Sequence, residues 1–287
     1  MHPKNIFDTS YDFDKLATVF PALEAHIIIN KYGVKSIDFS EAKSVKCLNT
    51  ALLKSTLKIG YWDFSQKNLC PAVPGRADYL YYLNDLLKNA KKIHILDIGT
   101  GASCIYPILG QALFDWQFTA SEISEKSLQN AKEIVKQNKL LNKIDLRLQI
   151  NKNKIMKNII KAGEYYDAVM CNPPFFKSKE AAIKANLRKQ RSLHRANKLL
   201  VVKSDNRNFS GIGKELWAKG GELVFLSRYI EESILFKKQV GWFTSLVSDK
   251  SNLKTLLKLL KNAVVDKHKI IEMQHGHKRV HLLAWHF

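Results

Sequence analysis

The tetrapeptide Asn172-Pro173-Pro174-Phe175 combines residue types that suit chemistry on an amine. The exocyclic amine of adenine is a poor nucleophile because its lone pair is delocalised into the ring. If the Asn172 side-chain oxygen and the Pro173 carbonyl each accept one N–H, the nitrogen can pyramidalise and attack a methyl group in line. The two prolines fix the backbone so that the carbonyl is already aimed, and Phe175 supplies a face for an extruded base. These four residues are predicted to be catalytic.

The tetrapeptide alone leaves its substrate open. The same arrangement suits adenine N6, cytosine N4 and the side-chain amide of glutamine, and Asn-Pro also begins ordinary turns. Its place in the chain favours catalysis, because it directly follows an apolar strand expected at Ala168–Cys171. Ligands of α/β sheets bind at the carboxyl ends of the strands. The tetrapeptide thus indicates a reaction type rather than a substrate.

A second candidate site begins with a buried strand expected at Ile93–Ile98, which runs into Gly99 and Gly101 and then into a helix. The glycines permit a sharp turn and let a ligand approach the backbone. Asp97, at the carboxyl end of the strand, suits an ammonium group. Glu122 ends the next strand and suits ribose hydroxyls. The alternative is that Asp97 caps the helix and Glu122 is solvated.

These features favour S-adenosylmethionine over NAD as the cofactor. A dinucleotide-binding fingerprint has glycine where this chain has Cys104, and no pyrophosphate anchor is evident. A lone G-x-G is weak evidence for a cofactor site, and Asp97 and Glu122 strengthen it.

The elements that position these residues alternate between strand and helix, which predicts an α/β fold of the Rossmann-like class with a doubly wound, mostly parallel sheet. Strands are expected at Ile93–Ile98, Gln117–Glu122, Ile144–Ile150, Ala168–Cys171 and Val240–Val247. Helices are expected near Ser103–Leu113, Lys126–Asn138, Lys154–Lys161, Glu222–Phe236 and Asn252–Lys261. Two closing strands, Lys267–Met273 and Arg279–Trp285, are expected to form an antiparallel hairpin.

Residues 1–70 are expected to form a basic, mainly helical extension that precedes the main domain at 71–287. Phe13, Leu16 and Phe20 lie at helical spacing ahead of a break at Pro21. Pro71-Ala72-Val73-Pro74-Gly75 is expected to lie outside any helix and to mark the junction. Helical spacing resumes over Asp78–Lys88.

The net charge of +20 and the isoelectric point near 9.7 predict a polyanionic partner, most simply a nucleic acid. The basic stretch 177–207 holds ten lysines and arginines against Glu180 and Asp205, so we expect a loop or an arm that becomes ordered on that partner. No apolar run approaches the ~20 residues of a membrane span. Four widely spaced cysteines indicate a reduced, cytoplasmic setting.

No metal is expected. The histidines His275, His277 and His281 share a hairpin but lack a matching cluster of acids or cysteines, so a surface or RNA-facing role is favoured over a metal site.

The whole chain resembles a known family, the adenine-N6 methyltransferases of bacterial 23S ribosomal RNA of the F type, which act on adenine 1618. Their eukaryotic relatives modify U6 small nuclear RNA. The resemblance rests on separate blocks, namely Met1–Asn5, Pro71–Tyr79, Asp97–Pro107, Glu215–Trp217, Gly220–Glu222, Trp242–Val247, Gly276–Lys278 and Ala284–Phe287.

The resemblance implies S-adenosylmethionine as cofactor and 23S ribosomal RNA, or a large-subunit assembly intermediate, as the partner of a monomeric enzyme. Arg76 also makes chemical sense there, because a guanidinium can pair with the carboxylate of the cofactor. The residues expected at the cofactor are Arg76, Asp97, Gly99, Thr100, Gly101, Ser103, Glu122 and Asn172.

The extension and the basic stretch are expected to hold the RNA through phosphate contacts. Phe176 departs from the bacterial pattern, in which histidine is usual at this position, and the Lys177–Arg207 stretch matches the family poorly. The residues expected at the RNA are His2, Lys4, Asn5, Lys31, Phe176, Lys177, Arg188 and Arg191.

Two other classes of function stay open. One is a methyltransferase of another RNA, of DNA or of a protein glutamine, although a glutamine-modifying enzyme has no need of a basic extension. The other is an RNA-binding protein that keeps the fold without turnover. The combination of Asp97, Glu122 and the complete tetrapeptide favours an enzyme over the latter.

Overall fold

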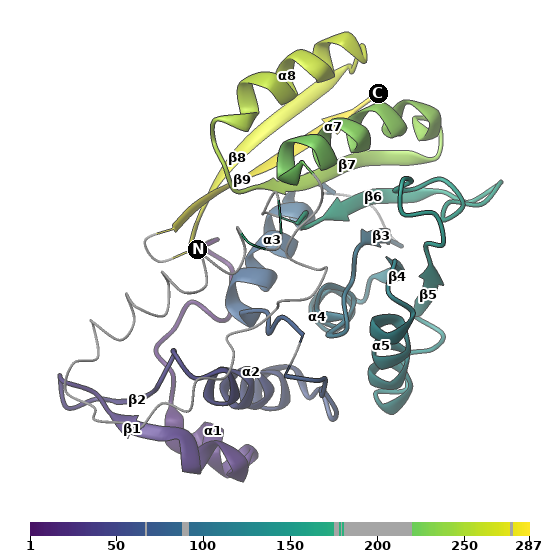
Figure 1. The fold of residues 1–287 in the computed structure, drawn as a ribbon. Coiled ribbons are helices and arrows are strands. Elements are labelled where there is room, and N and C mark those ends of the chain that lie inside the picture. The colour runs from purple at the N-terminus through teal and green to yellow at the C-terminus, as the bar shows by residue number, and fades with distance from the viewer. Residues whose placement is uncertain (67, 88–91, 175–177, 179, 181–219, 276–277) are drawn as a thin grey trace.

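The computed structural model describes residues 1–66, 68–87, 92–174, 178, 180, 220–275 and 278–287. Its centre is a seven-stranded sheet in the order β5-β4-β3-β6-β7-β9-β8 (Figure 1). The first five of these strands run parallel, and β9 is antiparallel to both β7 and β8. The strands are β3 (His94–Ile98), β4 (Gln117–Glu122), β5 (Ile144–Leu148), β6 (Tyr166–Cys171), β7 (Val240–Val247), β8 (Lys267–His275) and β9 (Lys278–His286). The α/β, doubly wound fold with a closing antiparallel hairpin is therefore confirmed.

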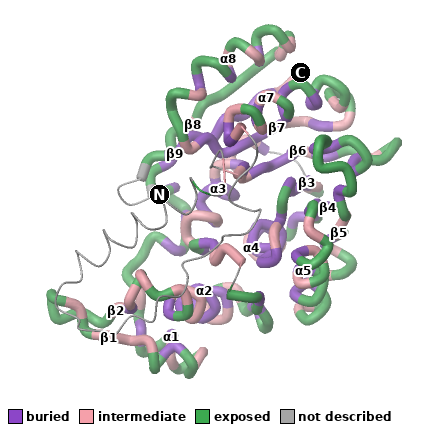
Figure 2. Tube along the Cα trace, in the orientation of Figure 1, coloured by how far each residue is buried: buried purple, intermediate pink, exposed green. Residues whose placement is uncertain are grey.

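Helices cover both faces of the sheet, and each face has its own buried cluster (Figure 2). One face packs against α3 (Val73–Leu86), α4 (Ile105–Phe114) and α5 (Glu125–Gln137). The other packs against α7 (Gly221–Ser233), α8 (Asn252–Asn262) and the segment that contains Met156 and Ile159. A short 3-10 turn, η2 (Ile234–Phe236), follows α7. Burial on both faces explains why β3 and β6 are continuous apolar runs.

The N-terminal residues fold against α3 and α4 rather than apart from them. Their elements are α1 (Phe13–Val19), η1 (Pro21–His26), β1 (Ile27–Ile29), β2 (Lys35–Ile37) and α2 (Ala42–Leu57). Leu23 and Leu53 belong to the same buried cluster as Leu80 of α3 and Leu109 of α4. The extension and the sheet thus share one hydrophobic core on this side.

The start of the chain is anchored on α3. The His2 backbone N–H donates to Asp78 Oδ1 at 2.6 Å, and the Asn5 amide donates to the same oxygen and to the Pro74 carbonyl, each at 3.1 Å. The His2 ring stacks on Tyr81. These contacts tie the first residues to the helix that carries Arg76.

The N-terminal extension is mainly helical and also contains the β1–β2 hairpin. Two local expectations are wrong. Residues 154–161 form turns instead of a helix, because Glu232 accepts hydrogen bonds from the backbone N–H groups of Ile155 and Lys157 and holds them in an open conformation. Helix α3 begins at Val73 and includes Pro74, which is tolerated because the first turn of a helix has no partner for that N–H.

No helix in the described residues is long and apolar enough to cross a membrane.

The packing of α4 on β4 makes a stability prediction. A methyl group at Gly110 would lie 2.6 Å from Cε2 of the buried Phe118 ring, well inside contact distance. Gly110→Ala should therefore lower the free energy of unfolding by about 1–3 kcal/mol, as overpacked core substitutions do. Gly60→Ala is the control, since its new methyl group meets only Asn138 Oδ1, at 3.8 Å. Urea unfolding measures both variants, and equal stabilities would contradict the prediction.

Candidate active site

The carboxyl ends of β3, β4 and β6 meet at one edge of the sheet and bring Asp97, Glu122 and Asn172 together. The register pairs Ile98 with Ser121 on one side and with Cys171 on the other. Each strand therefore ends within about one residue of its neighbours. Residues that are 75 positions apart in sequence, such as Asp97 and Asn172, lie at the same edge as a result.

The turn after β3 leaves open space in front of its backbone. Gly99 and Gly101 have φ angles of +75° and +66°, in the left-handed region that favours glycine. The N–H groups of Gly99 and Thr100 both donate to the Ser121 carbonyl, which fixes the turn against β4. A methyl group at Gly99 would meet no atom within 4 Å. A ligand can thus approach this turn closely.

Cys104 occupies the position at which a dinucleotide fingerprint has its third glycine, and its φ of 49° is also left-handed. It is the N-cap of α4 and makes no side-chain cap hydrogen bond. The Ser103 carbonyl just before it accepts a hydrogen bond from Trp62 Nε1 at 2.8 Å. The extension therefore helps to hold the turn, a contact that no sequence spacing indicates.

Asp97 is a buried acid without a hydrogen-bond partner. It is 1 % exposed, and among the described residues neither carboxylate oxygen has a hydrogen-bond partner, while the nearby Thr100 hydroxyl is directed at Cys104 Sγ, 3.7 Å away. The pKa of Asp97 is raised to about 7, mainly by burial. The Thr100 hydroxyl lowers this pKa, the charge of Glu122 raises it, and the charge of Arg76 lowers it. A helix-capping role is wrong, because the cap residue is Cys104. An unpaired buried carboxylate is costly, so this site suits a cationic donor.

Glu122 shapes the turn from the neighbouring strand. Its carboxylate accepts hydrogen bonds from the backbone N–H groups of Gly101 at 3.0 Å, Ile123 at 2.8 Å and Ser124 at 2.9 Å. The side chain is buried, so the alternative of a solvated Glu122 is also wrong. By these bonds Glu122 joins the glycine turn to the residues that lead into α5, including its N-cap Ser124.

Arg76 extends toward this edge from α3. Its guanidinium carbon lies 5.7 Å from the centroid of the Tyr106 ring at the start of α4, and its charge lowers the pKa values of Asp97 and Tyr106 against the larger effect of burial. Arg76 on α3 and the buried Asp97 on β3 thus approach the same glycine turn from two different elements.

The strand residue that precedes the tetrapeptide, Cys171, is held by a side chain of α3. The Tyr79 hydroxyl accepts a hydrogen bond from Cys171 N–H at 3.4 Å and bonds to Thr244 Oγ1 at 2.8 Å. The Asn172 side-chain oxygen is buried and accepts no hydrogen bond from the part of the chain that the structure describes, and Pro173 next to it is also buried. Asn172 therefore presents a free acceptor at the end of β6. Phe175 lies outside the described residues.

The residues expected at RNA differ in how accessible they are. His2 and Asn5 are buried, and their side chains bond to residues of α3, so a direct RNA contact would require this corner to open. Lys4 and Lys31 are exposed. The other four, Phe176, Lys177, Arg188 and Arg191, lie outside the described residues.

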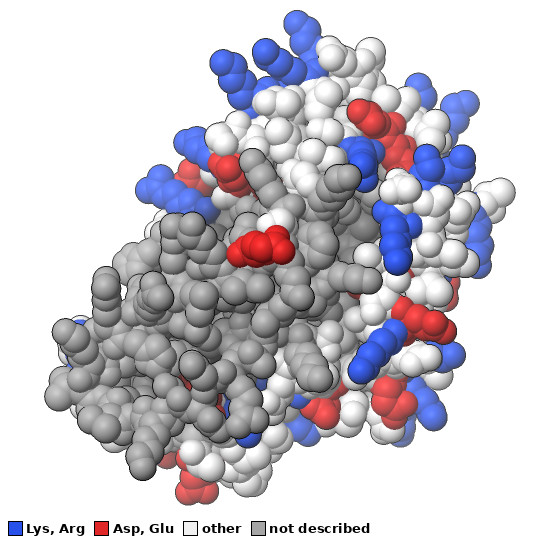
Figure 3. Space-filling view, in the orientation of Figure 1, with Lys and Arg blue, Asp and Glu red and all other residues white. Residues whose placement is uncertain are grey.

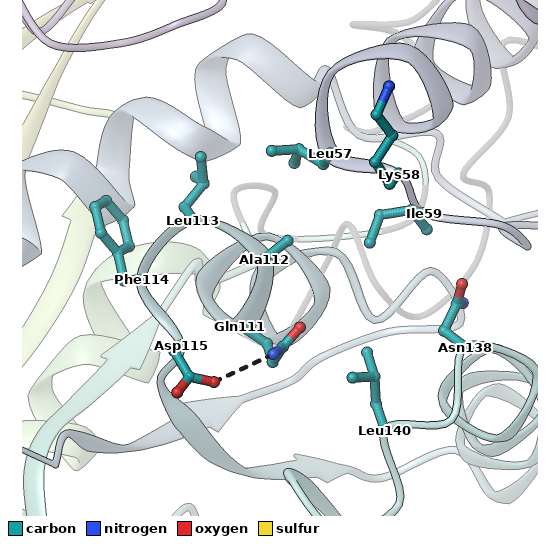
Figure 4. Close-up of a pocket in the computed structure, with 10 residues that line it drawn as sticks. All are labelled: Leu57, Lys58, Ile59, Gln111, Ala112, Leu113, Phe114, Asp115, Asn138 and Leu140. Atoms are coloured by element: carbon teal, nitrogen blue, oxygen red, sulfur yellow. Dashed lines mark hydrogen bonds between the residues drawn. The ribbon is translucent and has the colours of Figure 1, made fainter.

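A cavity of about 630 Å³ lies elsewhere, between the C-terminal ends of α2, α4 and α5 (Figure 4). Its wall includes Lys58, Asn138, and the hydrogen-bonded pair Gln111 and Asp115. It lies at the opposite end of α4 from the glycine turn, so it is separate from the site described above. Among the described residues, no group of three or more His, Cys, Asp or Glu side chains is placed to hold a metal ion.

Comparisons with known proteins agree with this geometry. A family model described as RNA methyltransferase matches residues 1–287. Two similar curated proteins are named ribosomal RNA large subunit methyltransferase F. The one from Bacteroides fragilis (strain YCH46) is 45 % identical over 100 % of this chain and 98 % of its own length. The one from Christiangramia forsetii is 44 % identical over 100 % of both chains.

Solved structures are similar over the full chain as well. The hMettl16 catalytic domain in complex with MAT2A 3′UTR hairpin 1 has a TM-score of 0.85 at 33 % identity, covering 100 % of this chain and 95 % of that one. The N-terminal domain of human METTL16 in complex with SAH has a TM-score of 0.80 at 29 % identity, covering 100 % and 98 %.

The raised pKa of Asp97 predicts how the stability of the ligand-free protein depends on pH. Between pH 3.8, the ordinary pKa of an aspartate, and a pKa of about 7 in the fold, the folded protein holds a proton that the unfolded chain has released. The stabilisation that comes from the proton on Asp97 is therefore fully present below pH 3.8. The free energy of unfolding then decreases by about 1.4 kcal/mol per pH unit as the pH rises toward about 7. Asp97→Asn should lose this dependence. Urea unfolding of both proteins across this range measures it, and the same pH dependence in each would refute it.

Proposed function

The chain belongs to the RNA methyltransferase family, and from this premise we propose that it transfers a methyl group from S-adenosylmethionine to the N6 amine of one adenine in 23S ribosomal RNA, adenine 1618. The observation that carries the proposal is the unpaired Asn172 side-chain oxygen, buried at the same sheet edge as the unpaired Asp97 carboxylate. The full-length relatives named for ribosomal RNA support the choice of RNA. We place the activity in the cytoplasm, in a monomeric enzyme.

The residues around the glycine turn fit the cofactor. When bound, S-adenosylmethionine supplies a methyl group on a positively charged sulfur. The ionised Asp97 carboxylate would pair with its ammonium group, and the Arg76 guanidinium with its carboxylate. The open space in front of Gly99 admits the ligand to the backbone. The remaining proposed contacts are Thr100, Gly101, Ser103, Glu122 and Asn172.

Asn172 and Pro173 prepare the target amine. The Asn172 oxygen accepts one N–H of the amine, and the Pro173 carbonyl accepts the other. This pulls the nitrogen out of conjugation with the ring and stabilises the positive charge that develops on it as the new N–C bond forms and the bond from the methyl carbon to the cofactor sulfur breaks. The methylated nitrogen then releases one proton to solvent. Tyr79 acts through the backbone, because its hydroxyl holds Cys171 and so fixes where Asn172 begins. Phe175 is proposed to stack on the extruded adenine.

The RNA would be held mainly by phosphate contacts. Lysine side chains are exposed along α8, including Lys254 and Lys258. Figure 3 shows Lys and Arg side chains, with Asp and Glu among them, on the described part of this face. The proposed RNA contacts within the described residues are Lys4 and Lys31, while His2 and Asn5 would act by anchoring the N-terminal residues on α3. Phe176, Lys177, Arg188 and Arg191 complete the proposed set.

Asn172→Ala tests the assigned chemistry. Loss of one preorganised acceptor should lower the methyl transfer rate by about 100-fold or more, while the dissociation constant for S-adenosylmethionine stays within a few-fold of wild type. Incorporation of labelled methyl groups into 23S rRNA that lacks the native modification measures the rate, and calorimetry measures cofactor binding. Asn262→Ala, at the exposed end of α8, is the control and should be fully active.

Retained activity in Asn172→Ala would refute the role of this side chain. Methylation mapped to a base other than adenine, or none on rRNA by the wild-type protein, would refute the proposed substrate.

A further inference from the structure

The hairpin of β1 and β2 stands at the outer end of the N-terminal extension, away from the sheet (Figure 1). Its inner end is buried, since Ile37 lies in the core shared with α3. Its outer end is exposed: Ile29 is 59 % exposed, Val34 is 58 % and Tyr32 at the tip is 76 %, and Figure 2 shows this tip in green. The burial of the inner end fixes the hairpin to the domain and leaves the tip in solvent.

The tip is rigid in its own right. The Asn30 side-chain oxygen accepts hydrogen bonds from the backbone N–H groups of Tyr32 at 2.9 Å and Val34 at 3.1 Å. The Asn30 backbone closes the same turn, with N–H to Val34 O at 2.9 Å and O to Gly33 N–H at 3.0 Å. Gly33 supplies the left-handed φ of +75° that the turn requires. Tyr32 is therefore presented in advance of any contact, which lowers the entropic cost of binding through it.

The chemistry of the tip suits a nucleobase. An exposed tyrosine ring lacks the favourable free energy that burial of its apolar surface would give. Any base can stack on such a flat ring in solvent. Lys31 Nζ lies over one face of that ring, 4.9 Å from its centroid, so a cation and the aromatic ring are presented together at the tip. Lys35, opposite Ile29 in the register, adds a second basic side chain, which pairs with Asp14. An aromatic ring beside a cation is the combination used to hold single-stranded nucleic acids.

We propose that Tyr32 stacks on an unpaired nucleotide of the RNA substrate, outside the target adenine, while Lys31 contacts a neighbouring phosphate. The inference rests on the proposed function only in taking RNA as the substrate. The net charge of +20 favours RNA over a protein partner at this tip. The hairpin belongs to the extension, whereas Asn172 lies at the sheet edge, so the enzyme would hold its substrate at two separated points.

Binding of RNA to the full chain tests this. The probes are a labelled 23S rRNA fragment that contains the target adenine and its unpaired neighbours, and a fully paired, blunt-ended RNA duplex of equal length. Tyr32→Ala should raise the Kd for the fragment by about 5- to 100-fold and leave the Kd for the duplex within twofold of wild type. Because tyrosine is uncharged, the slope of log Kd against log salt should not change.

Matched variants separate stacking from charge and from folding. Tyr32→Phe keeps the ring and should bind like wild type. Lys31→Ala should reduce the salt slope by about 0.7, the value for one phosphate contact on a single strand. Tyr165→Ala removes another exposed tyrosine, 55 % exposed and just before β6, and should leave the Kd for both RNAs unchanged.

An unchanged Kd for the fragment in Tyr32→Ala would overturn the proposal. If that variant nevertheless loses methylation of ribosomal particles but not of free rRNA, the tip binds a protein instead, which also overturns it. The wild-type methylation assay reports separately on the proposed function: wild type that binds the fragment through Tyr32 but methylates no adenine would refute the activity and leave the stacking contact standing.

Discussion

In the centre of the sheet, β3 pairs in parallel with β4 on one side and with β6 on the other, and all three strands end at the same level. This register places Asp97, Glu122 and Asn172 at one edge. A one-residue slip of β6 would move Cys171 from one buried face of the sheet to the other and move Asn172 out of the edge. Two acceptors are left without donors there, the Asp97 carboxylate and the Asn172 oxygen. Buried polar groups are normally paired, which supports the proposal that ligands supply both partners.

Helix α3 connects this edge of the sheet to the N-terminal residues through its side-chain contacts. Three residues of α3 have different contacts. Arg76 lies over the Tyr106 ring near the glycine turn, Asp78 accepts a hydrogen bond from the His2 backbone N–H, and Tyr79 bonds to β6 and β7. The extension meets the same region through Trp62, which donates to the Ser103 carbonyl. The N-terminal residues are thus part of the support of the site as well as the proposed RNA contact. Removal of the whole extension would expose the shared core, so single substitutions are the cleaner probes of RNA binding.

Much of the fold could be predicted from the sequence because buried parallel strands are apolar runs with polar residues at their ends. β4 and β7 begin and end where they were expected, and β3 differs by one residue. The errors have local causes. The apolar residues of 154–161 are buried without a helix because Glu232, far along the chain, takes their N–H groups. Asp97 and Asn172 follow from strand position, whereas the Tyr79 and Trp62 contacts join residues 92 and 41 positions apart and leave no sequence pattern.

The raised pKa of Asp97 couples this site to the proton concentration of its surroundings. With a pKa of about 7, the ligand-free protein at neutral pH is a mixture in which a large fraction carries a proton on that carboxyl. A cationic group that binds there stabilises the ionised form and expels the proton into the buffer. The heat measured on binding would then contain the ionisation enthalpy of whichever buffer takes up the proton. Binding of a cationic ligand at Asp97 is thereby coupled to the release of a proton, which the buffer takes up.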